Sequence, residues 1–396
     1  MIENKTILEK VVVAGLQLVG EDKRQFDEDM QEMVMLCQTA GAEVVSTIIQ
    51  KKDRPMPSTF LGEGKLKEIR TLMRGEGVKT LVVDAQLSPG QVRNIENTIK
   101  GKVLDRGQLI LDIFALHAKT VEAKVQVELA QMRTLYPRLT HAWTHFSQQV
   151  GGIGTRGPGE TQLEVDRRLV QKRITDLKAR LKKIEKNRKI QSKRRDTIFR
   201  ASLVGYTNVG KSSLLNALSG SEILVENKLF ATLDTSTRRT YIPGVGNIVI
   251  SDTVGFLRKL PHHLVASFRS TLSVVSEAQM LIVVLDASSE FFDQQLATVN
   301  SVLHDLGADD TRRLLVFNKI DLVDDPFVKK QLRLAYPDAI FISAHNKEDI
   351  SLLKGHIAET VIEYEKEKRV ENIIMERTKD LMQGSPHHDP KWKIQA

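Results

Sequence analysis

Apolar and polar positions alternate along the first 115 residues in two ways. Short apolar runs predict strands, and segments in which apolar residues recur every three or four positions predict helices. In chain order these are a strand at 11–15, a helix at 26–40, a strand at 44–49, a helix at 64–74, a strand at 80–84 and further β-prone sequence at 104–114. Such alternation favours an α/β domain with at least partly parallel strands.

Two long helices with a glycine-rich segment between them follow. Apolar residues are spaced by threes and fours over 119–136, and from about Gln162 they also step in sevens, as in a coiled-coil seam. Gly and Pro are too frequent at 151–159 for either helix to continue. We predict an antiparallel helical hairpin with a flexible tip. Its facing residues would be Val121, Val125, Leu129, Met132 and Tyr136 on one helix, and Leu163, Val170, Ile174, Leu177, Leu181 and Ile184 on the other.

From Phe199 strands and helices alternate again as far as about Tyr364. A charged run at 363–369 and a segment rich in Gly, Pro and His at 384–390 follow, and we expect this end to be largely disordered. The predicted fold class is therefore α/β with an inserted hairpin. Its parts would be an N-terminal α/β domain at 1–115, a basic hairpin at 116–197, a second α/β domain with a largely parallel sheet at 198–363, and a tail at 364–396.

Composition narrows the class of protein. Of the 396 residues 41% are hydrophobic and 27% charged, which argues against general disorder. The apolar run at 280–285 is far shorter than the about 20 residues that span a bilayer, so we expect a buried strand and no membrane span. Gln17 interrupts the run at 11–19, which favours a strand over a signal segment. Cys37 is the only cysteine and permits no internal disulfide, so we expect a cytoplasmic location.

Positive charge is concentrated on the second hairpin helix. Between Arg156 and Arg200 there are 16 Lys or Arg and 6 Asp or Glu, an excess of ten positive charges in a chain of net charge +8. This predicts a polyanionic partner, because Lys and Arg that neutralise phosphates release counterions. No aromatic residue lies between Arg156 and Thr197, so base stacking is not the expected mode. A solvated charged coiled coil is the alternative.

A phosphate-binding motif follows the strand that begins at Phe199. Its glycines let backbone N–H groups surround phosphate oxygens at a helix N-terminus. We expect Lys211 to reach the β- and γ-phosphates of a nucleoside triphosphate and the Ser212 hydroxyl to bind Mg²⁺. The candidate residues are Gly205, Tyr206, Thr207, Asn208, Val209, Gly210, Lys211 and Ser212.

Two later segments point to guanine. Asp321 would accept hydrogen bonds from the ring N–H and exocyclic amine of guanine, a donor pair that adenine lacks. Lys319 would lie along the base and Asn318 would brace the loops, whereas a charged turn after a strand is the alternative. Backbone groups at 343–345 would contact the guanine carbonyl oxygen. The candidates for GTP or GDP recognition are Asn318, Lys319, Ile320, Asp321, Ser343, Ala344 and His345.

The switch residues are expected between these motifs. Asp252 would hold Mg²⁺ through water, and the Gly255 N–H would face the γ-phosphate. Thr232 is the preferred second Mg²⁺ ligand, with Thr235, Ser236 and Thr237 as competitors. The nucleotide-contacting candidates here are Phe230, Ala231, Thr232, Leu233, Asp234, Asp252, Thr253, Val254 and Gly255, and the catalytic candidates are Lys211, Thr232 and Gly255.

Phe256 stands where Ras-like GTPases have the glutamine that orients the attacking water. An apolar ring cannot do this, so we expect slow intrinsic hydrolysis that a partner stimulates. Asn208 makes K⁺ a candidate second cofactor beside Mg²⁺, as a substitute for an arginine finger; a purely structural asparagine is the alternative.

The phosphate loop, Leu229-Phe-Ala-Thr-Leu-Asp234 and Asp252-Thr-Val-Gly-Phe256 resemble those of HflX-type GTPases of the Obg-HflX superfamily. So do Phe60-Leu-Gly-Glu-Gly-Lys65 and Gly151-Gly-Ile-Gly-Thr-Arg-Gly-Pro-Gly-Glu-Thr-Gln-Leu-Glu164, and the resemblance covers nearly the whole chain. It implies a P-loop GTPase domain in a cytoplasmic GTPase that binds the large (50S) ribosomal subunit. Thr235 and Ser236 replace the family's usual Pro-Thr, and His345 replaces a common Lys.

The resemblance gives the basic hairpin a partner, ribosomal RNA, whose cavities the glycine-rich tip with Arg156 would enter. The leading hypothesis is a GTPase, expected to be a monomer, that grips the large subunit in its GTP form and splits or rescues ribosomes under stress. A GTP-timed RNA-binding ribosome assembly factor is the alternative. A signalling switch with a protein effector is the third.

Overall fold

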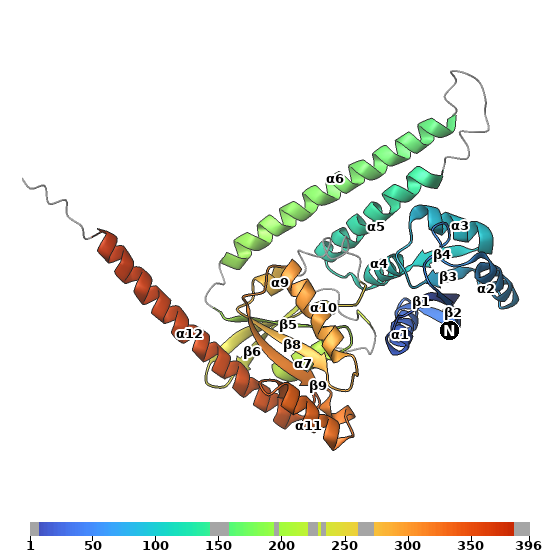
Figure 1. Cartoon of the computed structure of the whole chain (residues 1–396). Coiled ribbons are helices and arrows are strands. Elements are labelled where there is room, and N and C mark those ends of the chain that lie inside the picture. Colours follow the sequence, from blue (N-terminus) through green and yellow to red (C-terminus); the bar gives the residue numbers. More distant parts are fainter. Residues whose placement is uncertain are drawn as a thin grey trace, which may run out of the picture.

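The computed structural model describes residues 8–142, 158–193, 198–220, 229–230, 235–259 and 273–383. Two separate sheets are joined by a pair of long helices, α5 and α6, and a long C-terminal helix extends away from the second sheet (Figure 1). Among the described residues no helix has both the length and the apolar character needed to cross a bilayer.

The N-terminal unit has a sheet of order β2-β1-β3-β4 in which every pairing is parallel. Its elements are β1 Glu9–Leu18, α1 Lys23–Thr39, β2 Ala42–Lys52, α2 Glu63–Gly75, β3 Thr80–Val83, α3 Pro89–Ile99, β4 Lys102–Asp105 and α4 Arg106–His117. The predicted α/β alternation is thereby confirmed.

The β-prone assignment of 104–114 was wrong beyond Asp105. The Asp105 side chain accepts a hydrogen bond from the Gln108 N–H (2.8 Å) and caps α4, which begins at Arg106. Most of α4 is buried, so its sequence is apolar on nearly every side and lacks the period of a surface helix. Helix α3 was not predicted, although Ser88 and Gln91 form a capping box at its start.

Two apolar layers flank the N-terminal sheet. In one layer, helices α2 and α3 pack against side chains of the sheet such as Val12 and Leu81. The other contains α1 and α4 and continues into the C-terminal unit. There the Phe114 ring meets Phe230 edge to face, with 4.7 Å between ring centroids. The two units therefore share one core.

Helices α5 Val121–Ala142 and α6 Pro158–Lys193 form the predicted hairpin. Val125, Leu129, Ile174 and Leu177 are buried between them, with Met132, Tyr136, Val170 and Leu181 half-buried around these residues, so the predicted seam is confirmed.

Three details of the predicted hairpin either differ in the structure or fall on residues that the structure does not describe. Val121 does not face α6; it is 58% exposed at the first position of α5. Pro158 and Gly159 are already helical, since proline is favoured in the first helical turn. The rest of the tip, with Arg156, and the Leu163 side chain lie outside the described residues.

The C-terminal sheet has the order β10-β9-β8-β5-β7-β6 and is parallel except for β6, which pairs antiparallel with β7. This confirms a largely parallel sheet. Its elements are β5 Arg200–Gly205, α7 Lys211–Ser219, β6 Ser236–Ile242, β7 Gly246–Asp252, α9 Ser273–Ser276, β8 Met280–Asp286, α10 Phe292–Asp305, β9 Arg312–Asn318, the 3₁₀ helix η1 Ile320–Leu322, α11 Pro326–Ala335, β10 Ile340–Phe341 and α12 Lys347–Gln383.

The disorder expected after Tyr364 was wrong as far as Gln383, because α12 continues to that residue. From His356 to Gln383 the sequence contains no Gly or Pro and is rich in Glu and Lys, which favour helix. The Arg312 side chain also forms an ion pair with Glu367 on α12. Residues 384–396 lie outside the described part of the chain.

Candidate nucleotide-binding site

The phosphate-binding loop connects the end of β5 to the start of α7, as its motif predicts. Gly210 has a φ of +91°, and a Cβ there would overlap the Asn318 side-chain amide. A Cβ at Gly205 would overlap the Val284 carbonyl oxygen. Both glycines are therefore required by close approach of neighbouring groups.

Lys211 is buried within this loop. Its ammonium donates hydrogen bonds to the carbonyl oxygens of Tyr206 (2.6 Å) and Gly205 (3.2 Å). Burial lowers the pKa of Lys211 to about 8. Phosphate oxygens beside the ammonium would favour its charged form again, because an opposite charge at close range stabilises it.

Ser212 and Asp252, the candidate Mg²⁺ residues of two different motifs, are in contact. The Ser212 Oγ donates to Asp252 Oδ2 at 2.5 Å. Asp252 ends β7 next to Leu203 of β5, so adjacent parallel strands place the two side chains together. Oxygen donors of this kind suit Mg²⁺, which takes few protein ligands. No group of three or more His, Cys, Asp or Glu side chains that could hold a metal occurs in the described residues.

Residues 252–256, the expected second switch, contact the phosphate-binding loop. Thr207 N–H donates to the Phe256 carbonyl oxygen (2.9 Å), and Phe256 N–H donates to that of Gly205 (3.0 Å). A Cβ at Gly255 would come within 2.7 Å of Thr207 Cα and 3.0 Å of Lys211 Nζ. The Phe256 ring is buried among Val204 and Val275, so it is a core residue.

Asn318 joins the loops that would surround a guanine base. Its amide donates to the Val209 carbonyl oxygen (2.8 Å), and its Oδ1 accepts from the Ala344 N–H (3.0 Å). Asn318 thus bridges the phosphate-binding loop and the loop at Ala344. Lys319 adopts a φ of +61° and pairs with Asp286 at 2.7 Å, while the Asp321 side chain is exposed on η1.

The expected first switch, residues 230–234, is described only in part. Phe230 is buried against Phe114, so its ring is part of the core between the units. Ala231, Thr232, Leu233 and Asp234 lie outside the described residues, and the role of Thr232 stays a prediction. Its competitor Thr237 lies in β6 with its hydroxyl 3.0 Å from that of Ser251.

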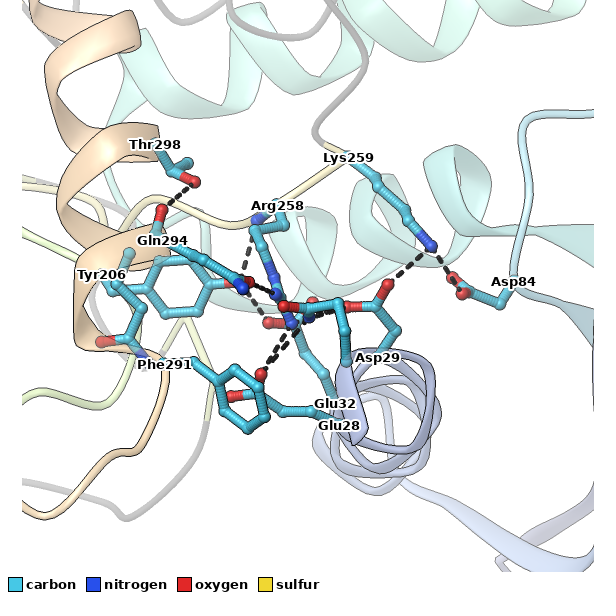
Figure 2. Close-up of polar contacts among 12 residues, drawn as sticks. Glu28, Asp29, Glu32, Asp84, Tyr206, Arg258, Lys259, Phe291, Gln294 and Thr298 are labelled. Carbon is cyan, nitrogen blue, oxygen red and sulfur yellow. Dashed lines mark hydrogen bonds and ion pairs between the residues drawn. The ribbon is translucent and has the colours of Figure 1, made fainter. Parts of the chain in front are cut away.

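Sequence reasoning missed a group of charged residues beside the site (Figure 2). The Tyr206 hydroxyl donates to the Glu32 carboxylate and accepts from the Arg258 N–H (2.9 Å). Glu32 is 174 positions from Tyr206 in the sequence, so no local pattern could have identified the contact.

Three family models match consecutive parts of the chain. They are described as "GTP-binding GTPase N-terminal" at 27–115, "GTP-binding GTPase Middle Region" at 117–195 and "50S ribosome-binding GTPase" at 200–319. Together they cover the N-terminal unit from within α1 to α4, most of the hairpin, and the C-terminal unit as far as the end of β9.

Relatives match over most of their lengths. "GTPase HflX" of Flavobacterium psychrophilum is 44% identical over 92% of this chain and 93% of its own. "GTPase HflX" of Escherichia coli (strain K12) is 46% identical over 75% of this chain and 70% of its own. Among solved structures, the crystal structure of SsGBP in complex with GDP is 26% identical over 90% of this chain and 99% of its own, with a TM-score of 0.51. The chain belongs to the HflX family of GTPases.

Proposed function

We propose that this GTP hydrolase grips the large ribosomal subunit in its GTP form, leaves after hydrolysis, and thereby splits or rescues ribosomes. The exposed basic surface of α6 carries the proposal. Every Lys and Arg between positions 164 and 187 of the described helix is exposed: Arg167, Arg168, Lys172, Arg173, Lys178, Arg180, Lys182, Lys183 and Lys186. Helix α6 extends along α5 away from the C-terminal sheet (Figure 1), and its exposed cations are accessible to RNA phosphates.

The proposed nucleotide chemistry uses residues that the sheet brings together. Lys211 and the backbone N–H groups of the loop would bind the phosphates, and Ser212, with Asp252 through water, would hold Mg²⁺. Mg²⁺ neutralises charge on the β- and γ-phosphate oxygens when it is bound. We propose Asp321 as the guanine-selective acceptor and Thr232 as the remaining Mg²⁺ ligand.

The buried Phe256 ring leaves the water-positioning role open to a partner, which supports ribosome-stimulated turnover. Asn208, which has a φ of +61° in the phosphate loop, keeps K⁺ as a proposed second cofactor. Faster turnover in potassium than in sodium buffer would support this role. Equal turnover in the two buffers would contradict it.

The decisive experiment measures GTP turnover by the purified protein with and without 50S subunits. We expect stimulation of at least about tenfold, and absence of stimulation would overturn the proposal. The triple change Lys178→Gln, Lys182→Gln and Lys183→Gln on α6 should lower the stimulation and leave intrinsic turnover unchanged. Lys329→Gln with Lys330→Gln on α11 is the matched control, because these lysines belong to neither the hairpin nor the nucleotide site.

The basic hairpin also fits an RNA-binding assembly factor whose nucleotide only times binding. Co-sedimentation with ribosomal subunits in GTP, GDP and a non-hydrolysable GTP analogue separates the two functions. The GTPase cycle predicts that Lys211→Ala abolishes the difference between the nucleotide states. The assembly factor predicts that Lys211→Ala binds as the unmodified chain does, whereas the α6 triple change does not.

A further inference from the structure

A pair of charged side chains lies at the carboxyl edge of the C-terminal sheet, between the ends of two neighbouring strands. Asp286 is the last residue of β8, and Lys319 directly follows the last residue of β9. The two strands are parallel, and their register places Asp286 beside Asn318. The Lys319 ammonium lies 2.7 Å from Asp286 Oδ2. The pairing of β8 with β9 thus brings these two side chains together.

The Asp286 carboxylate is held in a fixed orientation. Its Oδ1 accepts hydrogen bonds from the Ser288 N–H (3.0 Å) and from the Ser288 hydroxyl (2.6 Å). An aspartate that accepts from the backbone two residues further on forms a turn, which fixes the side chain relative to the strand end. The other oxygen, Oδ2, faces Lys319. The side chains of Asp286 and Lys319 are 15% and 25% exposed, so solvent screens this pair less than it screens a fully exposed ion pair.

The backbone at Lys319 is held in an uncommon conformation. Its φ of +61° lies in the left-handed region, which residues other than glycine rarely adopt and which neighbouring contacts must maintain. On one side the Ala287 N–H donates to the Asn318 carbonyl oxygen (2.8 Å). On the other side the Ile320 N–H donates to the Ile342 carbonyl oxygen (3.2 Å). The backbone therefore fixes where the lysine side chain starts, and the carboxylate fixes where it ends.

The position of the pair within the site suits the recognition of a base. Asn318, next to Lys319, bridges the phosphate-binding loop at Val209 and the loop at Ala344, and a base is expected beside these loops. Strand order places β8 and β10 on opposite sides of β9. Asp286 therefore holds the lysine from the side opposite the Ala344 loop.

Resting on the nucleotide site proposed above, we propose that Asp286 is a positioning residue for guanine nucleotides: its carboxylate anchors the Lys319 ammonium so that the methylene stem of Lys319 lies along the face of the base. A lysine without such a partner samples many rotamers, and ordering them on binding costs entropy. The ion pair orders the stem before the nucleotide arrives, so less binding free energy is lost. Asp286 thus acts at the base and leaves the phosphate contacts unchanged.

The test titrates the full-length protein with a GDP analogue that carries its fluorophore on the ribose. Asp286→Asn keeps the shape of the side chain but removes the charge that anchors the ammonium. We expect its dissociation constant for the analogue to rise about fivefold or more, through faster release. The hydrolysis of bound GTP in a single turnover should keep its rate, because the phosphate contacts are intact. A loss of hydrolysis as large as the loss of affinity would mean general damage to the site and would overturn the proposal.

The base itself provides a second readout. The lysine stem would pack against the ring face, which guanine and hypoxanthine share, so Asp286→Asn should weaken GDP and inosine diphosphate by the same factor. Lys319→Ala removes the stem, and Asp286→Asn added to it should weaken binding no further. Additive effects in this cycle, or unchanged GDP affinity in Asp286→Asn, would contradict the positioning role. So would a loss confined to GDP, since it would place Asp286 at the exocyclic amine.

Two further variants complete the experiment. Asp309→Asn is the matched control, because Asp309 pairs with His304 and Arg313 before β9 begins, at the opposite edge of the sheet. It should change neither affinity nor hydrolysis. Ser288→Ala removes the hydroxyl bond to Asp286 Oδ1 and should weaken GDP binding by a smaller factor. Should Asp286→Asn unfold the chain, Ser288→Ala becomes the test, and unchanged GDP affinity in it would overturn the proposal.

Failure of this inference and failure of the proposed function give different results. None of these measurements involves a ribosome, so absence of ribosome stimulation leaves them intact. If the unmodified chain binds GDP and Asp286→Asn binds it equally well, only the positioning role is wrong. If neither the unmodified chain nor Asp309→Asn binds GDP, the nucleotide site itself is wrong and the positioning role falls with it.

Discussion

The amide of Asn318 shows how much of the site depends on one side chain. It is 1% exposed and joins the phosphate-binding loop at Val209 to the loop at Ala344. Both bonds lie at the carboxyl edge of the sheet, where β9 ends. A short strand-ending motif therefore holds the loops from which a nucleotide would be recognised.

Replacement of Asn318 by alanine should destabilise the C-terminal unit by about 1–3 kcal/mol, because the Val209 carbonyl and the Ala344 N–H lose their partners. GDP affinity should fall with it. Urea unfolding and calorimetric titration measure the two effects. Asn300→Ala is the control, since that amide accepts an exposed bond from Arg313 and its loss should change stability by less than about 0.5 kcal/mol.

Cys37 gives a second prediction for a single residue. Its side chain is fully buried in α1, and burial raises the pKa of the thiol to about 12 by disfavouring the thiolate. At pH 8 the native protein should therefore react slowly with a thiol reagent such as Ellman's reagent, and denaturant should release one reactive thiol per chain. Rapid labelling in native buffer would show that α1 separates readily from its core.

At the scale of elements, the hairpin is held by a narrow apolar seam. Leu177 is 1% exposed on that seam, whereas Leu169 on the same helix is 60% exposed. Leu177→Ala should cost about 2–4 kcal/mol of local stability, because it removes buried contacts and leaves a cavity. Hydrogen exchange of the α6 amides measures this cost. Leu169→Ala is the matched control and should leave exchange nearly unchanged, so equal acceleration in both variants would contradict the packing.

Elements with one apolar face were predictable, and elements without one were not. The seam of α5 and α6 and the parallel strands follow from period and run length. Helix α4 was missed because it is buried on nearly every side, so its sequence has no helical period. The end of α12 was missed because its exposed charged surface resembles that of a disordered tail.

At the scale of the whole molecule, nucleotide binding should stabilise the chain by mass action. GDP with Mg²⁺ at about 100 times its dissociation constant should add about 2.7 kcal/mol to the unit that binds it. A thermal scan should therefore show a higher unfolding temperature with GDP and none of this shift with ATP at the same concentration. An equal shift with ATP would contradict the guanine role of Asp321.

The sequence alone determined those motifs whose functional residues are contiguous along the chain. The backbone conformation of a loop such as Gly205 to Ser212 follows from the residues of that loop. The motifs at Asp252 and Asn318 each end a strand, so they lie at the same edge of the sheet once its parallel strands pair. The helical seam is likewise a property of local periodicity. These features could be predicted because each depends on spacing along the chain.

Only the tertiary structure decided what surrounds those motifs. The contacts of Arg258 with Glu28 and Asp29 join residues about 230 positions apart, and no spacing rule connects them. The energetic weight of these contacts also depends on burial. A charge that is exposed on a helix keeps its hydration, whereas the same charge buried in an interface loses its hydration and requires a charged partner. The sequence thus specified a nucleotide site, and the packing of the N-terminal unit decided which distant residues lie beside that site.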